Sequence, residues 1–455
     1  MFNFRPFNHE IALPLPPTVQ ECVPEGHLAR YIVEIVNSLD LSVIENAYSG
    51  RGSAAYAPKV MLSLLIYSYA TGLFSSRKIE AATYDSLAFR YIACNDHPDH
   101  DTLNHFRNRF GDEFSSVFVQ VLAIAKESKV SRFGSVSLDG TKVHADASRH
   151  SALSYGHAQK MEAQLKAEVS ELMALADEAN RHARPLGMDL PEELQRREDR
   201  LQVLNEAKAK IEARAADRFA QEQADYEAKM VARQIKEADT SKKPGGSEPK
   251  APVDTGPLAK DQINLTDEES RIMHQASGGF EQSYNAQAVV DTESMLIMVA
   301  FVTQAVNDKK QVAPALAGLQ ALPETIPRPT TLLGDAGYYS EQNVNSCHEF
   351  GITPLIATGR ESHHPHWSER FGDDPPPLEK EEAATPVEEM KHQLKTQEGK
   401  ALYALRKQTV EPVFGIIKSV MGFRQFSVRG LKKVQNEWNL VCLAWNVKRL
   451  AVLCP

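Results

Sequence analysis

The chain of 455 residues has no long apolar segment and little cysteine. No apolar run approaches the roughly 18 residues that a membrane-spanning helix needs, so we expect no membrane partner. The five cysteines are scattered and form no CxxC pair: Cys22, Cys94, Cys347, Cys442 and Cys454. This scatter argues against a disulfide framework and against a zinc site, and it indicates reduced thiols.

The beginning of the chain also lacks the basic-then-apolar pattern that is typical of a secretory signal. Together with the reduced cysteines, this predicts a cytoplasmic protein. Hydrophobic residues make up 42% and charged residues 24% of the chain. These proportions are ordinary for a soluble globular protein, and the length leaves room for two or three domains with substantial cores.

An overall positive charge is missing as well, since the formal net charge is −9 at pH 7. The distribution of charge tells more than the total. From Lys400 to Arg449 there are ten basic and two acidic residues, whereas residues 361–399 hold ten acidic and four basic ones. A basic zone beside an acidic one is a usable electrostatic footprint for DNA. The plainer interpretation is a solvated helix face next to an acidic loop.

Changes of periodicity along the chain predict its organisation. Helical spacing dominates up to residue 132, strand-like alternation begins at Phe133, and two long apolar stripes with charged outer faces follow. The predicted parts are an N-terminal helical domain with possible DNA binding (1–132), a core with a mixed sheet and helices (133–155 and 259–451), an inserted antiparallel helical hairpin (156–238) and a flexible linker (239–258).

The local patterns predict individual elements within these parts. Helices are expected over 76–91, 102–126, 308–319 and 340–349, and strands over 287–290, 296–302, 330–334 and 353–356. Strands and helices that alternate in this way form an α/β fold with a mixed sheet.

Two aspartates occupy strand ends. Asp139 follows the apolar Val136 and Leu138 and precedes Gly140, and Asp335 ends the apolar run 331–334. An acid in an apolar strand is costly unless it is paired or bound to a metal. Ligands of open α/β sheets also bind beyond the carboxyl ends of strands. The alternative for both residues is a structural aspartate in a turn or a helix cap.

A third carboxylate, Glu411, lies in the basic zone directly before Pro412. Proline is best tolerated at the first position of a helix, which would place Glu411 at a helix start. The alternative is a helix that runs through both residues. Lys418 follows seven residues later, about two helical turns, and so lies on roughly the same face.

Three acidic side chains from separate segments suit one particular chemistry. Mg²⁺ prefers oxygen ligands. Two such ions held side by side activate the attacking oxygen and stabilise the leaving oxygen in phosphoryl transfer.

Six ordered blocks carry a resemblance to a known family. The chain resembles the DDE transposases of bacterial insertion sequences, in the branch with an N-terminal helical domain, from about Val23 to Ala451. The blocks are Pro98–Thr102 with Phe106 and Arg107, Leu138–Lys142, Asn264–Asp267 with Ser270 and Arg271, Tyr284–Gln287, Gly334–Tyr338, and Thr409–Gly415.

The resemblance implies an RNase H-like core and two Mg²⁺ ions, for which Mn²⁺ is able to substitute. It assigns the catalytic and metal-binding triad to Asp139, Asp335 and Glu411. It also implies a Tyr-x₂-Arg-x₃-Glu-x₆-Lys pattern around the glutamate. Arg406 lies one residue too far from Glu411 for this pattern, and Lys407 has the expected spacing, so either residue could serve. The expected DNA-contacting residues are Tyr403, Arg406, Lys407, Lys418 and Arg107.

The same resemblance implies the reaction and the partners. The expected activity is cleavage of phosphodiesters at the ends of an insertion sequence and transfer of the freed 3′-hydroxyls to target DNA. The partners would be double-stranded DNA, both terminal inverted repeats and target, and a second copy of the chain in a homodimer. Two other hypotheses stay open: a DNA-binding protein without catalysis, and a metal-dependent nuclease that cuts but does not join.

Overall fold

A computed structural model describes most of the chain. The described residues are 18–48, 54–182, 189–240, 245, 247–275, 278–359, 374–376 and 384–454. They divide into two compact units. One comprises residues 1–146, 275–278 and 283–455, and the other comprises residues 147–274 and 279–282, in each case as far as these are described.

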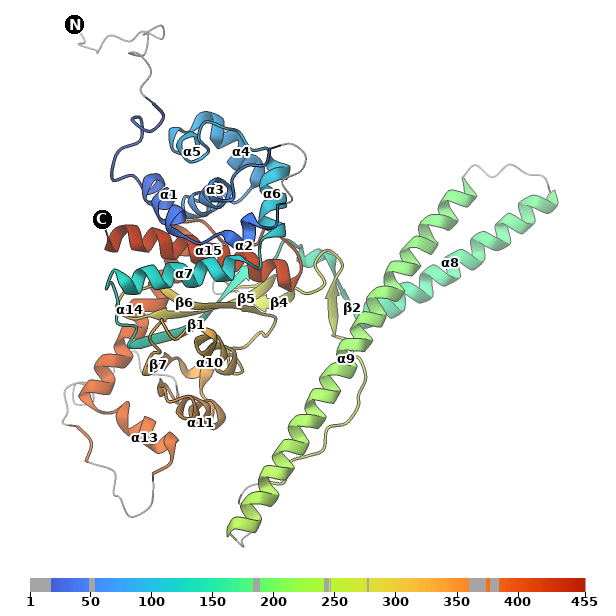
Figure 1. The fold of residues 1–455 in the computed structure, drawn as a ribbon. Coiled ribbons are helices and arrows are strands. Elements are labelled where there is room, and N and C mark those ends of the chain that lie inside the picture. Colours follow the sequence, from blue (N-terminus) through green and yellow to red (C-terminus); the bar gives the residue numbers. More distant parts are fainter. Residues whose placement is uncertain are drawn as a thin grey trace, which may run out of the picture. The chain divides into compact units, whose positions relative to one another are not determined.

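The first unit begins with helices, drawn from blue to turquoise in Figure 1: α1 (Leu28–Ser38), α2 (Ser42–Glu45), α3 (Pro58–Ala70), α4 (Ser76–Asp85), α5 (Leu87–Ile92), α6 (His100–Arg109) and α7 (Phe114–Glu127). Helix α3 is apolar on all sides, and its residues from Met61 to Ala70 are buried. A helix of this composition is stable only inside a core. It packs against α1 on one side and against the C-terminal helix α15 (Leu431–Leu453) on another.

Two helices that the sequence predicts as continuous are interrupted in the structure. The first breaks at Ser86, whose backbone is extended and whose carbonyl accepts a hydrogen bond from the Arg90 N–H, which starts the next helix. The second breaks near Gly111, where an added Cβ would lie 2.5 Å from Nδ2 of Asn436 on α15. Both predictions were wrong in extent, because the structure divides each predicted helix into two.

A mixed sheet forms the centre of the first unit. Its strands there are β1 (Ser135–His144), β5 (Phe280–Asp291, from Ser283 on), β6 (Ile297–Thr303), β7 (Thr331–Gly334) and β8 (Thr353–Ile356), and the sheet also includes β4 (Arg271–His274), whose residues are counted in the second unit. The strand order is β4-β5-β1-β7-β8, with β6 also paired to β5. β5 runs antiparallel to β1 and β6, whereas β7 is parallel to both β1 and β8. The predicted α/β class with a mixed sheet is confirmed.

Helices cover both faces of this sheet. Helix α15 packs against β6 and also against α3 and α7, and Figure 1 shows it between the sheet and the N-terminal helices. Helices α10 (Val312–Ala321) and α11 (Glu341–Glu349) lie on the other side. Helix α14 (Gln397–Ser419) packs against β1 and β7, and α13 (Pro386–Gln393) packs against β8 and α11. The strands that carry Asp139 and precede Asp335 therefore contact the helix that carries Glu411.

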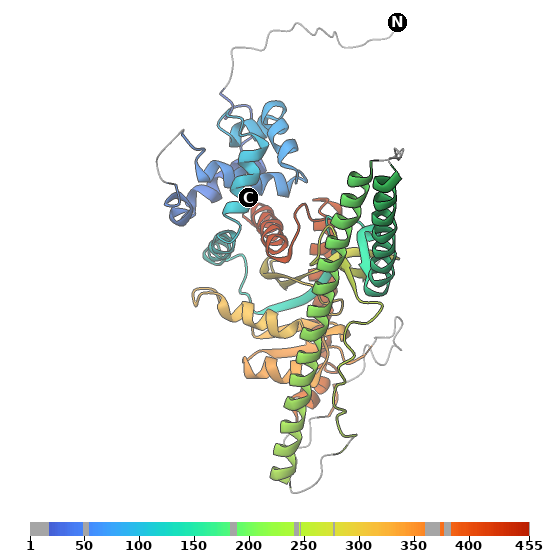
Figure 2. The ribbon, with the colours of Figure 1, turned by 90° about the vertical axis from the view of Figure 1, so that its right-hand side faces the viewer.

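The second unit contains two long helices, α8 (Tyr155–His182) and α9 (Leu190–Thr240), and a short antiparallel pair, β2 (Ala152–Ser154) with β3 (Gln262–Asn264). The helices pack side by side in both views (Figures 1 and 2). Their contact is apolar, with Leu165 of α8 and Leu204 and Ile211 of α9 buried. Ion pairs such as Arg197–Glu168 at 2.8 Å flank it and contribute little at an exposed surface. Within the described residues, no helix has both the length and the apolar character needed to cross a membrane.

Candidate active site

The register of the sheet brings Asp139 and Asp335 to the same level on neighbouring strands. β1 and β7 pair in parallel, with Ser135 opposite Thr331 and Ser137 opposite Leu333. Continuing this register by two residues sets Asp139 opposite Asp335, just past the carboxyl end of β7. Neighbouring strands lie roughly 4.8 Å apart. The two carboxylates that the sequence analysis selected therefore lie side by side on neighbouring strands, at the carboxyl end of β7.

Helix α14 carries Glu411, and Arg406 of the same helix links this glutamate to Asp139. Arg406 Nη1 lies 3.6 Å from Oδ2 of Asp139, and its Nη2 lies 3.3 Å from Oε1 of Glu411. The side chains of Arg406 and Asp139 are 11% and 19% exposed, so little water screens their contact, whereas Glu411 is 52% exposed and its contact is screened more. Arg406, one residue out of the expected spacing, is thus the base beside the carboxylates, and Lys407 is exposed.

Pro412 lies inside α14, so the helix runs through Glu411 and Pro412 and does not begin there. Of the two alternatives, the continuous helix is correct. A proline in a helix interior removes a backbone hydrogen bond and costs about 3 kcal/mol or more. Beside a candidate catalytic glutamate, such a departure from local preference is typical of a functional site.

The other predicted residues of α14 take different positions. Tyr403 is half-buried and lies near the Arg406 guanidinium, where it helps to raise the pKa of Arg406. Lys418 is also half-buried, and its Nζ donates a 2.7 Å hydrogen bond to the backbone carbonyl of Lys142 on β1. Burial, and then the charge of Arg424, lower the pKa of Lys418. This lysine holds α14 against the strand that carries Asp139.

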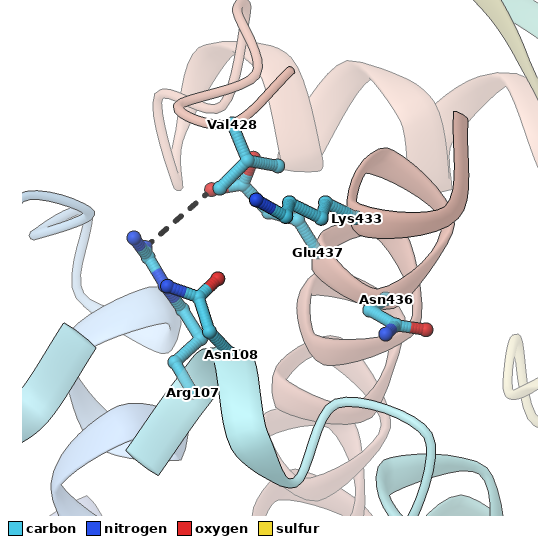
Figure 3. A pocket seen from close by; sticks show the side chains of 6 residues that line it. All are labelled: Arg107, Asn108, Val428, Lys433, Asn436 and Glu437. Atoms are coloured by element: carbon cyan, nitrogen blue, oxygen red, sulfur yellow. Dashed lines mark ion pairs between the residues drawn. The ribbon is translucent and has the colours of Figure 1, made fainter. Parts of the chain in front are cut away.

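Arg107 does not lie beside the three candidate carboxylates. Its side chain is 11% exposed, and Nη1 donates to the Tyr69 hydroxyl at 2.9 Å and lies 3.8 Å from Oε1 of Glu437. Figure 3 shows this ion pair beside a small pocket that Asn108, Val428, Lys433 and Asn436 also line. Internal partners hold both terminal nitrogens of the guanidinium, and contact of Arg107 with DNA stays a prediction.

Burial and neighbouring acids make the site electrostatically unbalanced. The pKa of Asp139 rises from 3.8 to about 7, chiefly because the side chain is buried. The Gly140 N–H, which donates to Oδ1 at 2.7 Å, and Arg406 lower it, while Asp335 and Asp308 raise it. When Asp139 is ionised, the negative charges of the region therefore outnumber the positive charges of Arg406 and Lys142.

A polar network beneath Asp139 was missed by the sequence analysis as a part of the site. Gln287 Nε2 and Asn285 Nδ2 each donate to Oδ1 of Asp308 at 2.7 Å. The Tyr338 hydroxyl donates to Oε1 of Gln287 at 2.6 Å. Burial raises the pKa of Tyr338, and the charges of Asp139, Asp308 and Asp335 raise it further. The tyrosine hydroxyl therefore remains a neutral donor. The one available signal was the Asn285-x-Gln287 spacing, which puts both amides on the same face of the strand.

Gly140 is required by this network. A Cβ at this position would lie 2.0 Å from Nε2 of Gln287 and 2.8 Å from Oδ1 of Asn285, and both amides are fully buried. We expect Gly140→Ala to lower the free energy of unfolding by about 1–3 kcal/mol, as overpacking does in close-packed interiors. Urea unfolding followed by tryptophan fluorescence measures this.

Gly134 provides the matched control, because a Cβ there meets nothing within 4 Å. Equal unfolding free energies of the Gly140→Ala and Gly134→Ala proteins would contradict the proposed packing.

The donor set suits hard divalent cations. Asp139, Asp335 and Glu411 offer only carboxylate oxygens, which Mg²⁺ and Mn²⁺ accept. In this structure no three acidic, histidine or cysteine side chains of the described residues are close enough to share one ion. Arg406 lies between Asp139 and Glu411 and supplies the positive charge there.

Comparison with protein families agrees with this geometry. Residues 252–447 match a family described as "Transposase DDE domain", and residues 17–109 match a "Transposase domain (DUF772)". The first match includes Asp335 and Glu411 and begins after Asp139. No curated protein and no solved structure gives a match.

The two matches identify the chain as a transposase, a protein that acts on DNA. More closely, it belongs to the DDE transposases of insertion sequences, whose catalytic domain is RNase H-like. The strand order observed here, with three antiparallel strands followed by two parallel ones, is consistent with that core.

Proposed function

We propose that this transposase cleaves phosphodiesters at the ends of its insertion sequence and transfers the freed 3′-hydroxyls to target DNA. Asp139, Asp335 and Glu411 are the proposed catalytic residues and the ligands of two Mg²⁺ ions, with Mn²⁺ as a substitute. The observation that carries the proposal is the contact of a single arginine with both Asp139 and Glu411, at the strand level shared by Asp335.

When bound, the two ions supply activation of the attacking oxygen and stabilisation of the leaving oxygen. The residues of the chain position the DNA around them. Lys407 is exposed on α14, at the surface where a phosphate of the DNA would lie. Arg406 pairs with the carboxylates here, and once it leaves them its planar guanidinium is suited to a phosphate. Such contacts position DNA without reading its sequence.

The proposed partners are the terminal inverted repeats and target DNA, bound by a homodimer. The positively charged stretch from Lys400 to Arg449 supports DNA binding at the face that α14 contributes. We also propose the domain layout inferred from the sequence, in which N-terminal helices precede the core and a helical insert interrupts it.

The proposal is tested with the full-length protein and a labelled DNA fragment that contains the element's ends. Cleavage is expected only with Mg²⁺ or Mn²⁺, followed by strand-transfer products on a target plasmid. Asp139→Asn, Asp335→Asn and Glu411→Gln should each abolish both products, and each variant should still bind the ends.

The result separates the remaining hypotheses. Cleavage by all three variants at the wild-type rate would reject the triad. End binding by the wild type without any cleavage would indicate a DNA-binding protein, and cleavage without strand transfer would indicate a nuclease.

A further inference from the structure

Asp308 is a fourth carboxylate near the candidate triad. It follows β6 and precedes helix α10, and its side chain is 27% exposed. The sequence predicts a helix from this residue, but α10 begins at Val312, because Asp308 forms a turn in which its carbonyl accepts from the Gln311 N–H. The turn leaves the carboxylate directed at Asn285 and Gln287 on β5.

The two amides connect Asp308 to the strand of Asp139. In the antiparallel pairing of β1 and β5, Gly140 lies opposite Gln287 and Lys142 lies opposite Asn285. A Cβ on Gly140 would lie 2.9 Å from Oδ1 of Asp308, in addition to its collision with Gln287. The backbone that follows Asp139 therefore rests directly on the Asp308 network.

The same network reaches the segment of Asp335. Gln287 accepts from the Tyr338 hydroxyl, and the Tyr338 N–H donates to the carbonyl of Asp335 at 3.1 Å. Gln287 thus has Asp308 on its amide nitrogen and Tyr338 on its amide oxygen. Trp438 of α15 also donates to the backbone carbonyl of Gln287 at 3.0 Å, which fixes the strand from the other side.

Asp308 also forms an ion pair with Lys142 of β1. The lysine Nζ is buried and forms no hydrogen bond with any described residue, and it lies 3.6 Å from Oδ1 of Asp308. Burial lowers the pKa of Lys142, and the negative charges of Asp308 and Asp139 oppose that change. A buried cation without a counter-charge is strongly unfavourable.

We propose that Asp308 is a positioning residue of the catalytic site. It orients the amides of Asn285 and Gln287, which align the segments of Asp139 and Asp335, and it balances the charge of Lys142. Its Oδ1 is committed to two amide donors, so it acts through these neighbours and is not itself a metal ligand. This inference rests on the proposed function, because the aligned residues are the proposed metal ligands.

Two substitutions separate the two tasks. Asp308→Ala removes both the acceptor oxygen and the charge. Asp308→Asn keeps an acceptor oxygen for the amides but leaves Lys142 without a negative partner. Partners that orient metal ligands typically contribute roughly 10–100-fold to metal affinity. We therefore expect Asp308→Ala to weaken Mn²⁺ binding by about 10–100-fold and Asp308→Asn to weaken it less.

The first measurement is Mn²⁺ binding to the full-length protein without DNA, followed by electron paramagnetic resonance. Asp146→Asn is the matched control, since Asp146 is a partly exposed acid paired with Arg429 at 2.9 Å, and it should bind Mn²⁺ like the wild type. Adding Lys142→Met to Asp308→Asn should restore part of the lost affinity, because the unbalanced cation is then absent.

The second measurement does not involve a metal. Amide hydrogen exchange of the metal-free protein, read by mass spectrometry, should accelerate in Asp308→Ala over peptides that contain Asp139–Lys142 and Asp335–Tyr338. Peptides of α8 and α9 should exchange as in the wild type. This readout stays decisive if the wild type binds no Mn²⁺, an outcome that would reject the metal site and leave the positioning role to be judged by exchange.

Three results would overturn the inference. The first is unchanged exchange in both peptides of Asp308→Ala. The second is wild-type Mn²⁺ affinity in Asp308→Ala. The third is a loss in Asp308→Asn as complete as in Asp335→Asn, which would make Asp308 a metal ligand.

Discussion

Replacing Asp139 by asparagine is expected to stabilise the metal-free protein at alkaline pH. In the folded chain the pKa of this aspartate rises from 3.8 to about 7, first because of burial and then because of Asp335 and Asp308. Between these two values the folded state retains a proton that the unfolded state releases. The free energy of unfolding of the wild type therefore falls as the pH rises through this interval.

Asparagine does not titrate, so the advantage of the variant should grow with pH. The raised pKa corresponds to a difference between variant and wild type that increases by up to about 2–3 kcal/mol from pH 5 to pH 8. Urea unfolding in a chelating buffer, followed by the fluorescence of Trp438 and Trp445 in α15, measures it in the unit that contains the site.

Mg²⁺ should reverse this order. A ligand that binds only the folded state stabilises it, by about 2.7 kcal/mol at a concentration of one hundred times its dissociation constant. The wild type should gain this stability and Asp139→Asn should not. Asp146→Asn serves as the control and should follow the wild type at both pH values. A constant difference between Asp139→Asn and wild type from pH 5 to pH 8 would refute the electrostatic argument.

Replacing Glu437 by alanine is expected to be strongly destabilising. The Glu437 side chain is 1% exposed and accepts hydrogen bonds from the Tyr69 hydroxyl at 2.7 Å and from the Ser427 N–H at 2.8 Å. It is also the ion-pair partner of the mostly buried Arg107. Removing one member of a buried charge pair costs about 3–5 kcal/mol, because the other charge remains uncompensated. Urea unfolding should show a loss of this size.

Two further variants distinguish the lost charge from lost volume. Glu437→Gln keeps acceptor oxygen for Tyr69 or Ser427 and should cost less than alanine. Adding Arg107→Met to Glu437→Gln should recover part of the stability, since no unpaired cation is then buried. If Glu437→Ala unfolds at the wild-type urea concentration, the network contributes nothing and the prediction fails.

The two aspartates could be predicted because their signals are local, although Asp139 lies within β1 and only Asp335 follows the end of a strand. Asp139 and Asp335 each follow apolar residues and have a glycine next to them. The parallel register of β1 with β7 then places the two residues at the same level, at the carboxyl end of β7. Glu411 was found through its basic surroundings and its family block, and its place within a continuous helix needed the structure.

Other features depend on partners far away in the sequence. Arg107 belongs to a family block and looks like a basic residue available to DNA, but its partner Glu437 lies 330 residues later. Asn285, Gln287 and Asp308 look like polar residues in and after a strand. Their role depends on the pairing of β5 with β1 and on the turn before α10, neither of which leaves a periodic pattern.

Arg406 bears on whether the chain needs a metal ion in order to fold. Many metal-binding chains need their ion to fold, because the free energy of metal binding is part of their folding free energy. Here the guanidinium already neutralises part of the repulsion between Asp139 and Glu411. If the proposed metal site is correct, we therefore expect the chain to fold in a chelating buffer and to bind its divalent ions in a separate, reversible step.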